Sequence, residues 1–82
     1  MEIIIYGKDG CTQCDKARML CQIGSLAFDY RIVGADISVP ALQAKVGQPV
    51  RSLPQIFIRR GEGDTYVGGY EALRTHLRQP VA

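Results

Sequence analysis

The C-x-x-C motif at residues 11–14 follows a short apolar run directly, and this order constrains the fold more than any other feature. Glu2 to Tyr6 is a β-branched run that ends at Gly7, which is typical of a buried strand. From Thr12 to about Ile23 apolar residues recur at helical spacing, and Gly24 is a typical helix stop. We therefore expect the cysteine pair to lie between a strand and the helix that follows it.

The rest of the chain continues this alternation of strands and helices. Periodicity and turn residues predict a half-buried strand over residues 27–33, a helix between Ser38 and Gly47, a hairpin of strands 55–59 and 65–67 around a turn at 60–64, and a helix over residues 70–78 ended by Pro80. The order β-α-β-α-β-β-α predicts an α/β domain spanning residues 1–82, with a four-stranded mixed sheet. The first βαβ unit should be parallel, and helices should cover both faces of the sheet.

Composition limits the function classes. The chain has 82 residues, which allows one domain with a modest core, and its 10 basic and 8 acidic residues give a net charge of +2. Neither a basic stripe nor an aromatic platform is visible, so we expect no nucleic-acid partner. The N-terminus does not resemble a signal peptide, and no apolar run approaches the roughly 18 residues of a membrane span. We expect a cytoplasmic protein, a setting in which structural disulfides are rare.

The position of the C-x-x-C pair favours redox chemistry. Cys11 is expected at the first turn of the helix, where unpaired N–H groups and the positive end of the helix dipole stabilise a thiolate. Lys8, three residues earlier, adds positive charge. Cys14 is one turn further on and close enough to attack a mixed disulfide on Cys11. Cys11 is thus the predicted nucleophile and Cys14 the predicted resolving thiol.

The third cysteine, Cys21, is too far along the helix to join this pair. At about 1.5 Å per residue it lies ~10 Å from Cys14 and ~15 Å from Cys11, whereas the Cα atoms of a disulfide lie within about 7 Å. We expect Cys21 to pack as a small buried apolar residue, with glutathionylation or intermolecular oxidation as the alternative. A zinc site would need four ligands, and only Cys21 and His76 remain besides the pair, so no metal is expected.

Three segments together carry a resemblance to a known family. They are Lys8 with Cys11-Thr12-Gln13-Cys14, Arg51-Ser52-Leu53-Pro54, and Gly68-Gly69-Tyr70. In this order and spacing, the chain resembles a small bacterial or phage dithiol glutaredoxin over essentially its whole length. The resemblance implies a thioredoxin fold and a groove for glutathione beside Cys11.

The resemblance also implies the residues of that groove. Leu53 would pair its backbone with the cysteine moiety of glutathione, and Pro54 would follow a cis peptide bond. The expected glutathione-binding residues are Lys8, Gln13, Arg51, Leu53, Pro54, Gly69, Tyr70 and Glu71. Each has an ordinary alternative: a solvated surface for the basic residues, a strand-entry role for the proline, and a plain turn for the glycines.

The function implied is glutathione-dependent reduction of protein disulfides and glutathione mixed disulfides by a monomer. Glutathione would be the reducing co-substrate, and ribonucleotide reductase is one candidate protein substrate. Thr12 and Gln13 replace the proline and aromatic residue common in the family, and Ala72 replaces a common acidic residue. The first alternative is therefore a glutaredoxin-like donor reduced by thioredoxin reductase, which passes electrons to ribonucleotide reductase. The second is a carrier of a [2Fe–2S] cluster held by Cys11 and glutathione thiols.

Overall fold

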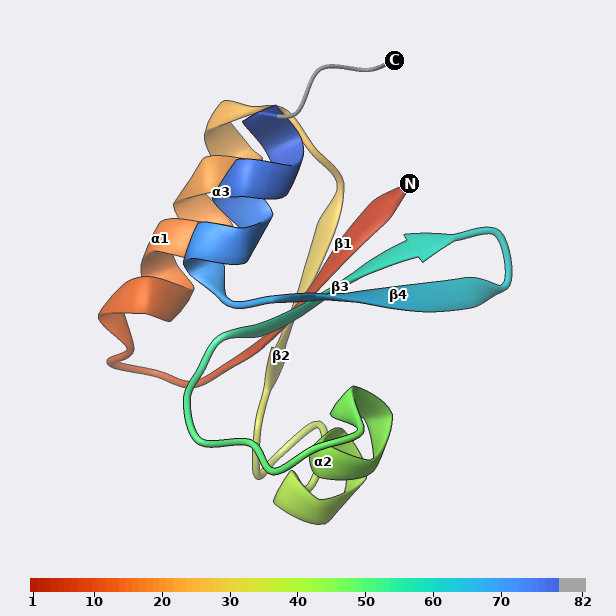
Figure 1. The fold of residues 1–82 in the computed structure, drawn as a ribbon. Helices are drawn as coiled ribbons and strands as arrows, with labels where there is room; N and C mark the ends of the chain where they lie inside the picture. The colour runs from red at the N-terminus through yellow and green to blue at the C-terminus, as the bar shows by residue number, and fades with distance from the viewer. Residues whose placement is uncertain (79–82) are drawn as a thin grey trace.

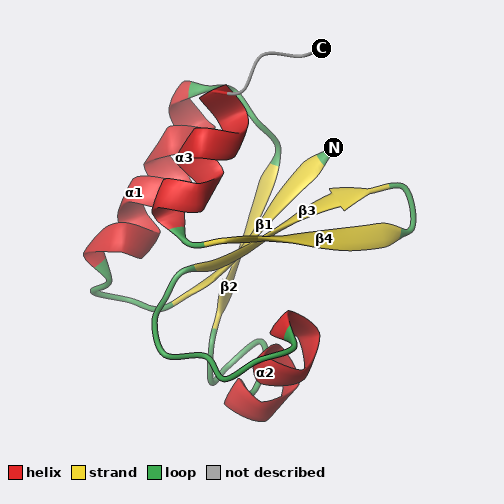
Figure 2. Ribbon diagram, viewed as in Figure 1, coloured by secondary structure: helices red, strands yellow, loops and turns green. Residues whose placement is uncertain are grey.

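One four-stranded sheet carries helices on both of its faces (Figures 1 and 2). The structure is a computed structural model and describes residues 1–78. In chain order the elements are β1 (Glu2–Gly7), α1 (Thr12–Ile23), β2 (Phe28–Ile32), α2 (Val39–Val46), β3 (Gln55–Arg60), β4 (Gly63–Gly68) and α3 (Tyr70–Arg78). The predicted element order and α/β class are confirmed. Pro80, the expected helix stop, lies outside the described residues.

The sheet has the strand order β2-β1-β3-β4. β1 pairs with β2 in parallel, with Ile5 opposite Tyr30, and with β3 antiparallel, with Ile5 opposite Ile56. The hairpin partner β4 adds the last strand at the other edge. The mixed sheet with a parallel first βαβ unit is therefore as predicted.

The apolar side chains form one core on each face of the sheet. Alternate residues of a strand point to opposite faces, so the consecutive isoleucines of β1 contribute to both cores. α1 and α3 lie side by side on one face and α2 covers the other (Figure 1). The core under α1 and α3 contains Ile3, Ile5, Ala17, Cys21, Ile56, Ile58 and Leu73; the core under α2 contains Ile4, Tyr6, Leu42 and Phe57.

Capping residues fix where α2 begins and ends. Ser38 caps α2 as predicted, since its Oγ accepts a hydrogen bond from the Ala41 N–H at 3.2 Å. Gly47 ends α2 in the left-handed conformation, with φ of 86°, which glycine adopts without a steric penalty.

Within residues 1–78, no helix has the length and apolar content needed to cross a membrane.

The hairpin is tighter than the sequence pattern predicts. β3 extends to Arg60 and β4 begins at Gly63, so the turn contains only Gly61 and Glu62 instead of residues 60–64. Gly61 has φ of 59°, which a tight turn requires and which favours glycine. Gly63 and Asp64 are predicted to lie in the turn, yet pairing with Arg60 and Arg59 of β3 makes them part of β4.

A charged cluster ties α2 to the hairpin. Lys45 Nζ lies 2.6 Å from Asp64 Oδ2, and Arg59 Nε donates to Asp64 Oδ1 at 2.9 Å. These contacts, from Arg59 first and then Lys45, hold the pKa of the Asp64 carboxyl well below its usual range. The Lys45 ammonium also lies 5.0 Å from the centre of the Phe57 ring, so α2 is fixed over the sheet by charge as well as by packing.

Candidate active site: a cysteine pair beside a cis-proline loop

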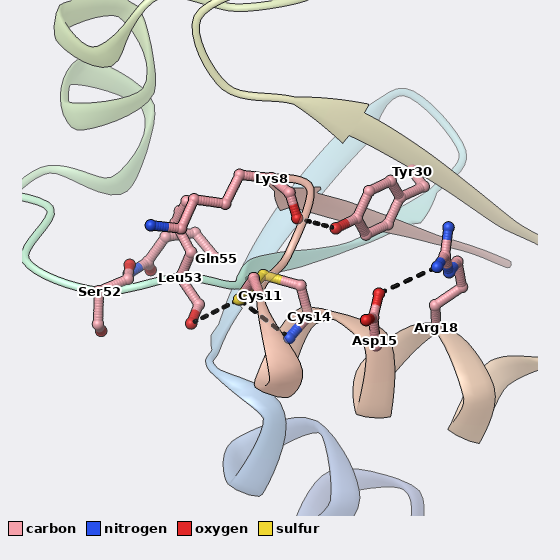
Figure 3. The surroundings of a disulfide bond; sticks show 9 residues. All are labelled: Lys8, Cys11, Cys14, Asp15, Arg18, Tyr30, Ser52, Leu53 and Gln55. Atoms are coloured by element: carbon pink, nitrogen blue, oxygen red, sulfur yellow. Dashed lines mark hydrogen bonds and ion pairs between the residues drawn. A yellow bond between two sulfur atoms is a disulfide. The ribbon is translucent and has the colours of Figure 1, made fainter.

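Cys11 is the N-cap of α1. Its backbone is extended, and its Sγ accepts a hydrogen bond from the Cys14 N–H at 3.3 Å (Figure 3). An N-cap side chain normally satisfies one of the free N–H groups of the first helical turn with oxygen. Here sulfur takes that place, at the positive end of the helix dipole. The arrangement stabilises negative charge on the Cys11 sulfur, the state in which a thiol attacks a disulfide.

The two cysteines form a disulfide and differ in burial. Their Cα atoms are 5.2 Å apart, within the range that a disulfide requires. Cys14 is 0% exposed, whereas Cys11 is partly exposed. An incoming substrate can therefore reach the Cys11 sulfur, while the Cys14 sulfur lies beneath it. This geometry suits Cys11 as the nucleophile and Cys14 as the resolving thiol.

The loop before β3 forms the wall next to Cys11. The Leu53–Pro54 peptide bond is cis, and the Leu53 carbonyl oxygen lies 3.8 Å from Cys11 Sγ (Figure 3). Within residues 1–78, the Leu53 N–H has no hydrogen-bond partner. Helix α2 holds the start of the loop, since Gln43 Oε1 accepts a hydrogen bond from the Val50 N–H at 3.0 Å. The Leu53 backbone is thus presented beside the reactive sulfur.

Three of the predicted glutathione-binding residues share one hollow with Cys11. The hollow has a volume of about 390 Å³, and its wall includes Lys8, Arg51 and Leu53. Three valines, Val33, Val39 and Val50, supply its apolar surface. An accessible sulfur, two cationic side chains and a free backbone N–H therefore meet in one place.

A second, more polar hollow adjoins the first, since the two share Arg51 and Ser52. It has a volume of about 430 Å³ and contains Arg51, which both hollows share, and Gly69. A Cβ atom built on Gly69 would lie 3.6 Å from the Pro54 carbonyl oxygen, so the turn before α3 approaches the cis-proline loop closely. Arg51, Pro54 and Gly69 are thus neighbours although they are far apart in the sequence.

The other predicted binding residues lie around this region or beyond it. Gln13 is exposed in the first turn of α1, and Tyr70 is half-buried, with Lys16 Nζ 6.0 Å from its ring centre. Glu71 lies on a different hollow, of about 490 Å³, between β4 and α3, together with His76. The Glu71 side chain is 77% exposed and lies 3.8 Å from Arg74. The structure does not bring Glu71 onto the hollow that contains Cys11.

Two residues near the cysteine pair carried no signal of a role in the sequence. A Cβ atom on Gly7 would lie 2.6 Å from the Tyr30 hydroxyl and 2.9 Å from Cys14 Sγ, so both groups use the space that this glycine leaves. The Tyr30 hydroxyl donates to the Lys8 carbonyl at 3.0 Å, which fixes the loop leading to Cys11 (Figure 3). The sequence pattern indicates only a strand end at Gly7 and a strand residue at Tyr30. A contact across 22 residues has no local pattern that would reveal it.

Cys21 is the free cysteine among the described residues, and it is buried. It is 0% exposed and packs with Ile3, Ile5 and Leu73 in the core under α1 and α3. Burial raises the pKa of the Cys21 thiol, which disfavours the reactive thiolate. The prediction that Cys21 packs as a small apolar residue is confirmed.

Comparisons with known proteins agree with this geometry. The chain is 41% identical to a glutaredoxin of Haemophilus influenzae over 64 residues, which are 71% of this chain and 74% of the relative. It is 32% identical to glutaredoxin 1 of Escherichia coli over 76 residues, 85% of each chain. The solved structure of reduced Escherichia coli glutaredoxin has a TM-score of 0.80 at 28% identity, covering 95% and 94% of the two chains. No protein-family model matches the chain.

A glutaredoxin-like protein, the NrdH-redoxin of Escherichia coli, shares the fold. It has a TM-score of 0.57 at 23% identity over the full length of both chains.

The sheet, the cap sulfur and the buried second sulfur define the class of protein. A thioredoxin fold with an accessible cysteine at a helix N-terminus and a second cysteine one turn further on is a thiol–disulfide oxidoreductase. The sequence relatives narrow this class to a single family. The chain belongs to the glutaredoxin family.

Proposed function

We propose that the chain is a glutathione-dependent thiol–disulfide oxidoreductase. The observation that carries the proposal is the hollow beside Cys11, whose wall combines Lys8, Arg51 and Leu53. Glutathione is a short peptide with two carboxylates and a thiol. A free backbone N–H next to the reactive sulfur and two cationic side chains match these groups.

The proposed site uses both hollows. The cysteine moiety of glutathione lies against the Leu53 backbone, with Pro54 behind it, and one carboxylate faces Lys8 or Arg51. The γ-glutamyl end extends past Arg51 toward Gly69, which has no side chain of its own in front of the loop. Gln13, Tyr70 and Glu71 complete the set predicted from the family resemblance, as candidate contacts at the edges of the site.

The proposed reaction begins with attack by the Cys11 thiolate. It attacks the glutathione sulfur of a glutathionylated protein, so the mixed disulfide breaks and the substrate thiolate leaves and takes up a proton. Cys11 is then linked to glutathione, which rests in the groove. A second glutathione thiolate attacks this glutathione sulfur, releasing oxidised glutathione and the Cys11 thiolate. One free glutathione is thus consumed, and the oxidised glutathione that leaves joins it to the glutathione taken from the substrate.

A protein disulfide needs the second cysteine. Cys11 attacks one substrate sulfur and forms a mixed disulfide with the protein. Cys14 then loses its proton and attacks Cys11 Sγ, which releases the reduced substrate and leaves the Cys11–Cys14 disulfide seen in the structure. Two glutathione molecules restore the dithiol.

An NADPH-coupled assay of hydroxyethyl disulfide reduction tests the choice of reductant. One reaction contains glutathione and glutathione reductase, and the other contains thioredoxin reductase alone. We expect turnover with the glutathione system. Turnover with thioredoxin reductase alone would contradict the proposal and favour a glutaredoxin-like electron donor.

Two variants test the roles of the cysteines, with the same glutathione system as reductant and either a glutathionylated peptide or a protein disulfide as substrate. Cys11→Ser should abolish all exchange, because the serine hydroxyl is not a nucleophile toward disulfides at neutral pH. Cys14→Ser should retain deglutathionylation of a glutathionylated peptide and lose reduction of a protein disulfide. Equal loss of both activities in Cys14→Ser would refute the division of roles.

The proposed setting is the cytoplasm, with the chain acting as a monomer on disulfide-containing or glutathionylated proteins. Ribonucleotide reductase, named by the family resemblance, is one protein substrate to assay.

A further inference from the structure

Gln55 is a polar residue in a place that favours apolar side chains. Among residues 1–78 it is the one polar or charged residue that is buried, at 7% exposure. Both ends of its side-chain amide are hydrogen-bonded: Nε2 donates to the Ser52 carbonyl at 2.8 Å, and Oε1 accepts from the Tyr66 hydroxyl. Burying an amide is costly unless it is paired, so these two contacts are what make the residue acceptable there.

Tyr66 reaches Gln55 from the edge strand β4. Its ring packs against Phe57, with the ring centres 5.2 Å apart, on the face of the sheet covered by α2. Its hydroxyl donates a hydrogen bond to Gln55, the first residue of β3, which follows the cis-proline loop directly. Tyr66 and Gln55 also line the polar hollow that contains Arg51 and Gly69.

These contacts form a continuous chain from the sheet edge to the reactive sulfur. The Tyr66 hydroxyl holds the Gln55 amide, which holds the Ser52 carbonyl. The next residue is Leu53, whose carbonyl lies 3.8 Å from Cys11 Sγ. Gln43 restrains the opposite end of the loop at Val50, and the Gln55 contact adds a hydrogen bond to the half nearest to Cys11, where Leu53 also packs on the core under α2.

We propose that Tyr66 is a positioning residue for the redox groove. Acting through Gln55, it holds the Ser52–Leu53 backbone in the place where a ligand bound at Cys11 meets it. The inference rests on the proposed glutathione site. A backbone segment that already has its bound conformation loses less conformational entropy when a ligand binds. Loss of the Tyr66 hydroxyl should therefore weaken ligand binding and leave the sulfur chemistry at Cys11 unchanged.

Steady-state kinetics with a glutathionylated peptide, in the presence of glutathione and glutathione reductase, test this role. Tyr66→Phe removes the hydroxyl and keeps the ring on Phe57. Gln55→Glu keeps an acceptor for Tyr66 and loses the N–H that holds Ser52. Tyr6→Phe is the matched control, since it also removes one hydroxyl from the α2 face, but that hydroxyl contacts Arg31 at 3.4 Å.

We expect Tyr66→Phe to raise the KM for the glutathionylated peptide about threefold to tenfold, as for loss of one hydrogen bond, with kcat within about twofold. Gln55→Glu should shift KM in the same direction, and Tyr6→Phe should leave it unchanged. An unchanged KM in Tyr66→Phe would overturn the inference. This holds also if kcat and the melting temperature both fall, because such a result would indicate a general structural role. If Gln55→Glu does not fold, Tyr66→Phe decides alone. Absence of glutathione-dependent turnover in the unmodified protein would instead refute the proposed function.

Discussion

Replacing Gly7 by alanine should disturb the packing under the active-site disulfide. The backbone of Gly7 has a conformation open to any residue, so only the space around the new Cβ matters. That atom would lie 2.6 Å from the Tyr30 hydroxyl and 2.9 Å from Cys14 Sγ, whereas ordinary van der Waals contact begins at 3.4 Å. The oxygen must therefore move by about 0.8 Å and the sulfur by about 0.5 Å.

The cost can be estimated from what each group would lose. Cys14 is fully buried and cannot move far without displacing the start of α1. Tyr30 can tilt, but it then loses its hydrogen bond to Lys8. Overpacking typically costs about 1–3 kcal/mol and one hydrogen bond about 0.5–1.5 kcal/mol, so Gly7→Ala should lower the free energy of unfolding by roughly 2–3 kcal/mol. The melting temperature should fall by on the order of 10–20 °C.

Urea denaturation of the oxidised protein, with a double-mutant cycle, measures this cost. Tyr30→Phe removes the closest clashing atom but leaves the ring carbon Cζ at 3.0 Å from the new Cβ. Gly7→Ala should thus cost about 1 kcal/mol less in the Tyr30→Phe background than in the wild type. A cost below about 0.5 kcal/mol in the wild type, or an equal cost in both backgrounds, would refute the packing argument.

Two further predictions concern the charged cluster and the buried thiol. Asp64→Asn should cost about 1 kcal/mol at pH 7. Because Arg59 and Lys45 lower the pKa of Asp64, its contribution is present above the unfolded pKa near 4 and is lost as pH falls toward the lower folded value. The stability difference from wild type in urea denaturation should therefore shrink between about pH 5 and pH 2, and a constant difference would contradict this. Cys21→Ser should keep both exchange activities while losing about 1–2 kcal/mol of stability, because it places a hydroxyl in an apolar core; a large loss of turnover in a folded variant would overturn the packing role.

Local patterns were enough to predict most of the fold. The β-branched run of β1, the helical spacing in α1 and the caps at Ser38 and Gly47 are each signals within a few residues. The hairpin ends could not be predicted in this way. Residues 63 and 64 are Gly-Asp, a pair with low strand propensity, and only pairing across the tight turn makes them part of β4.

The candidate site likewise contains some residues that the sequence predicts and some contacts that it does not. The sequence motif predicted Cys11 and Cys14, and the family resemblance predicted the neighbours Lys8, Arg51 and Leu53, which the structure places on one hollow with Cys11. Glutathione binding at these residues stays a prediction. The contacts of Tyr30 with Lys8 and of Tyr66 with Gln55 join residues far apart in the chain, so no local sequence pattern indicates either contact.

The reactivity of the cysteine pair follows from where the motif begins relative to the helix. Cys14, Ala17 and Cys21 form one stripe of α1 that faces the sheet and is fully buried, so the sulfur of Cys14, which we propose as the resolving thiol, occupies a core position. Cys11 precedes the first helical residue, lies off that stripe and remains partly exposed as the cap. The spacing of three residues thus keeps the sulfurs close enough to bond while only one is open to a substrate. A thiol in the core is shielded from external oxidants, and the sulfur within its reach is that of Cys11, which it can attack once Cys11 is part of a mixed disulfide.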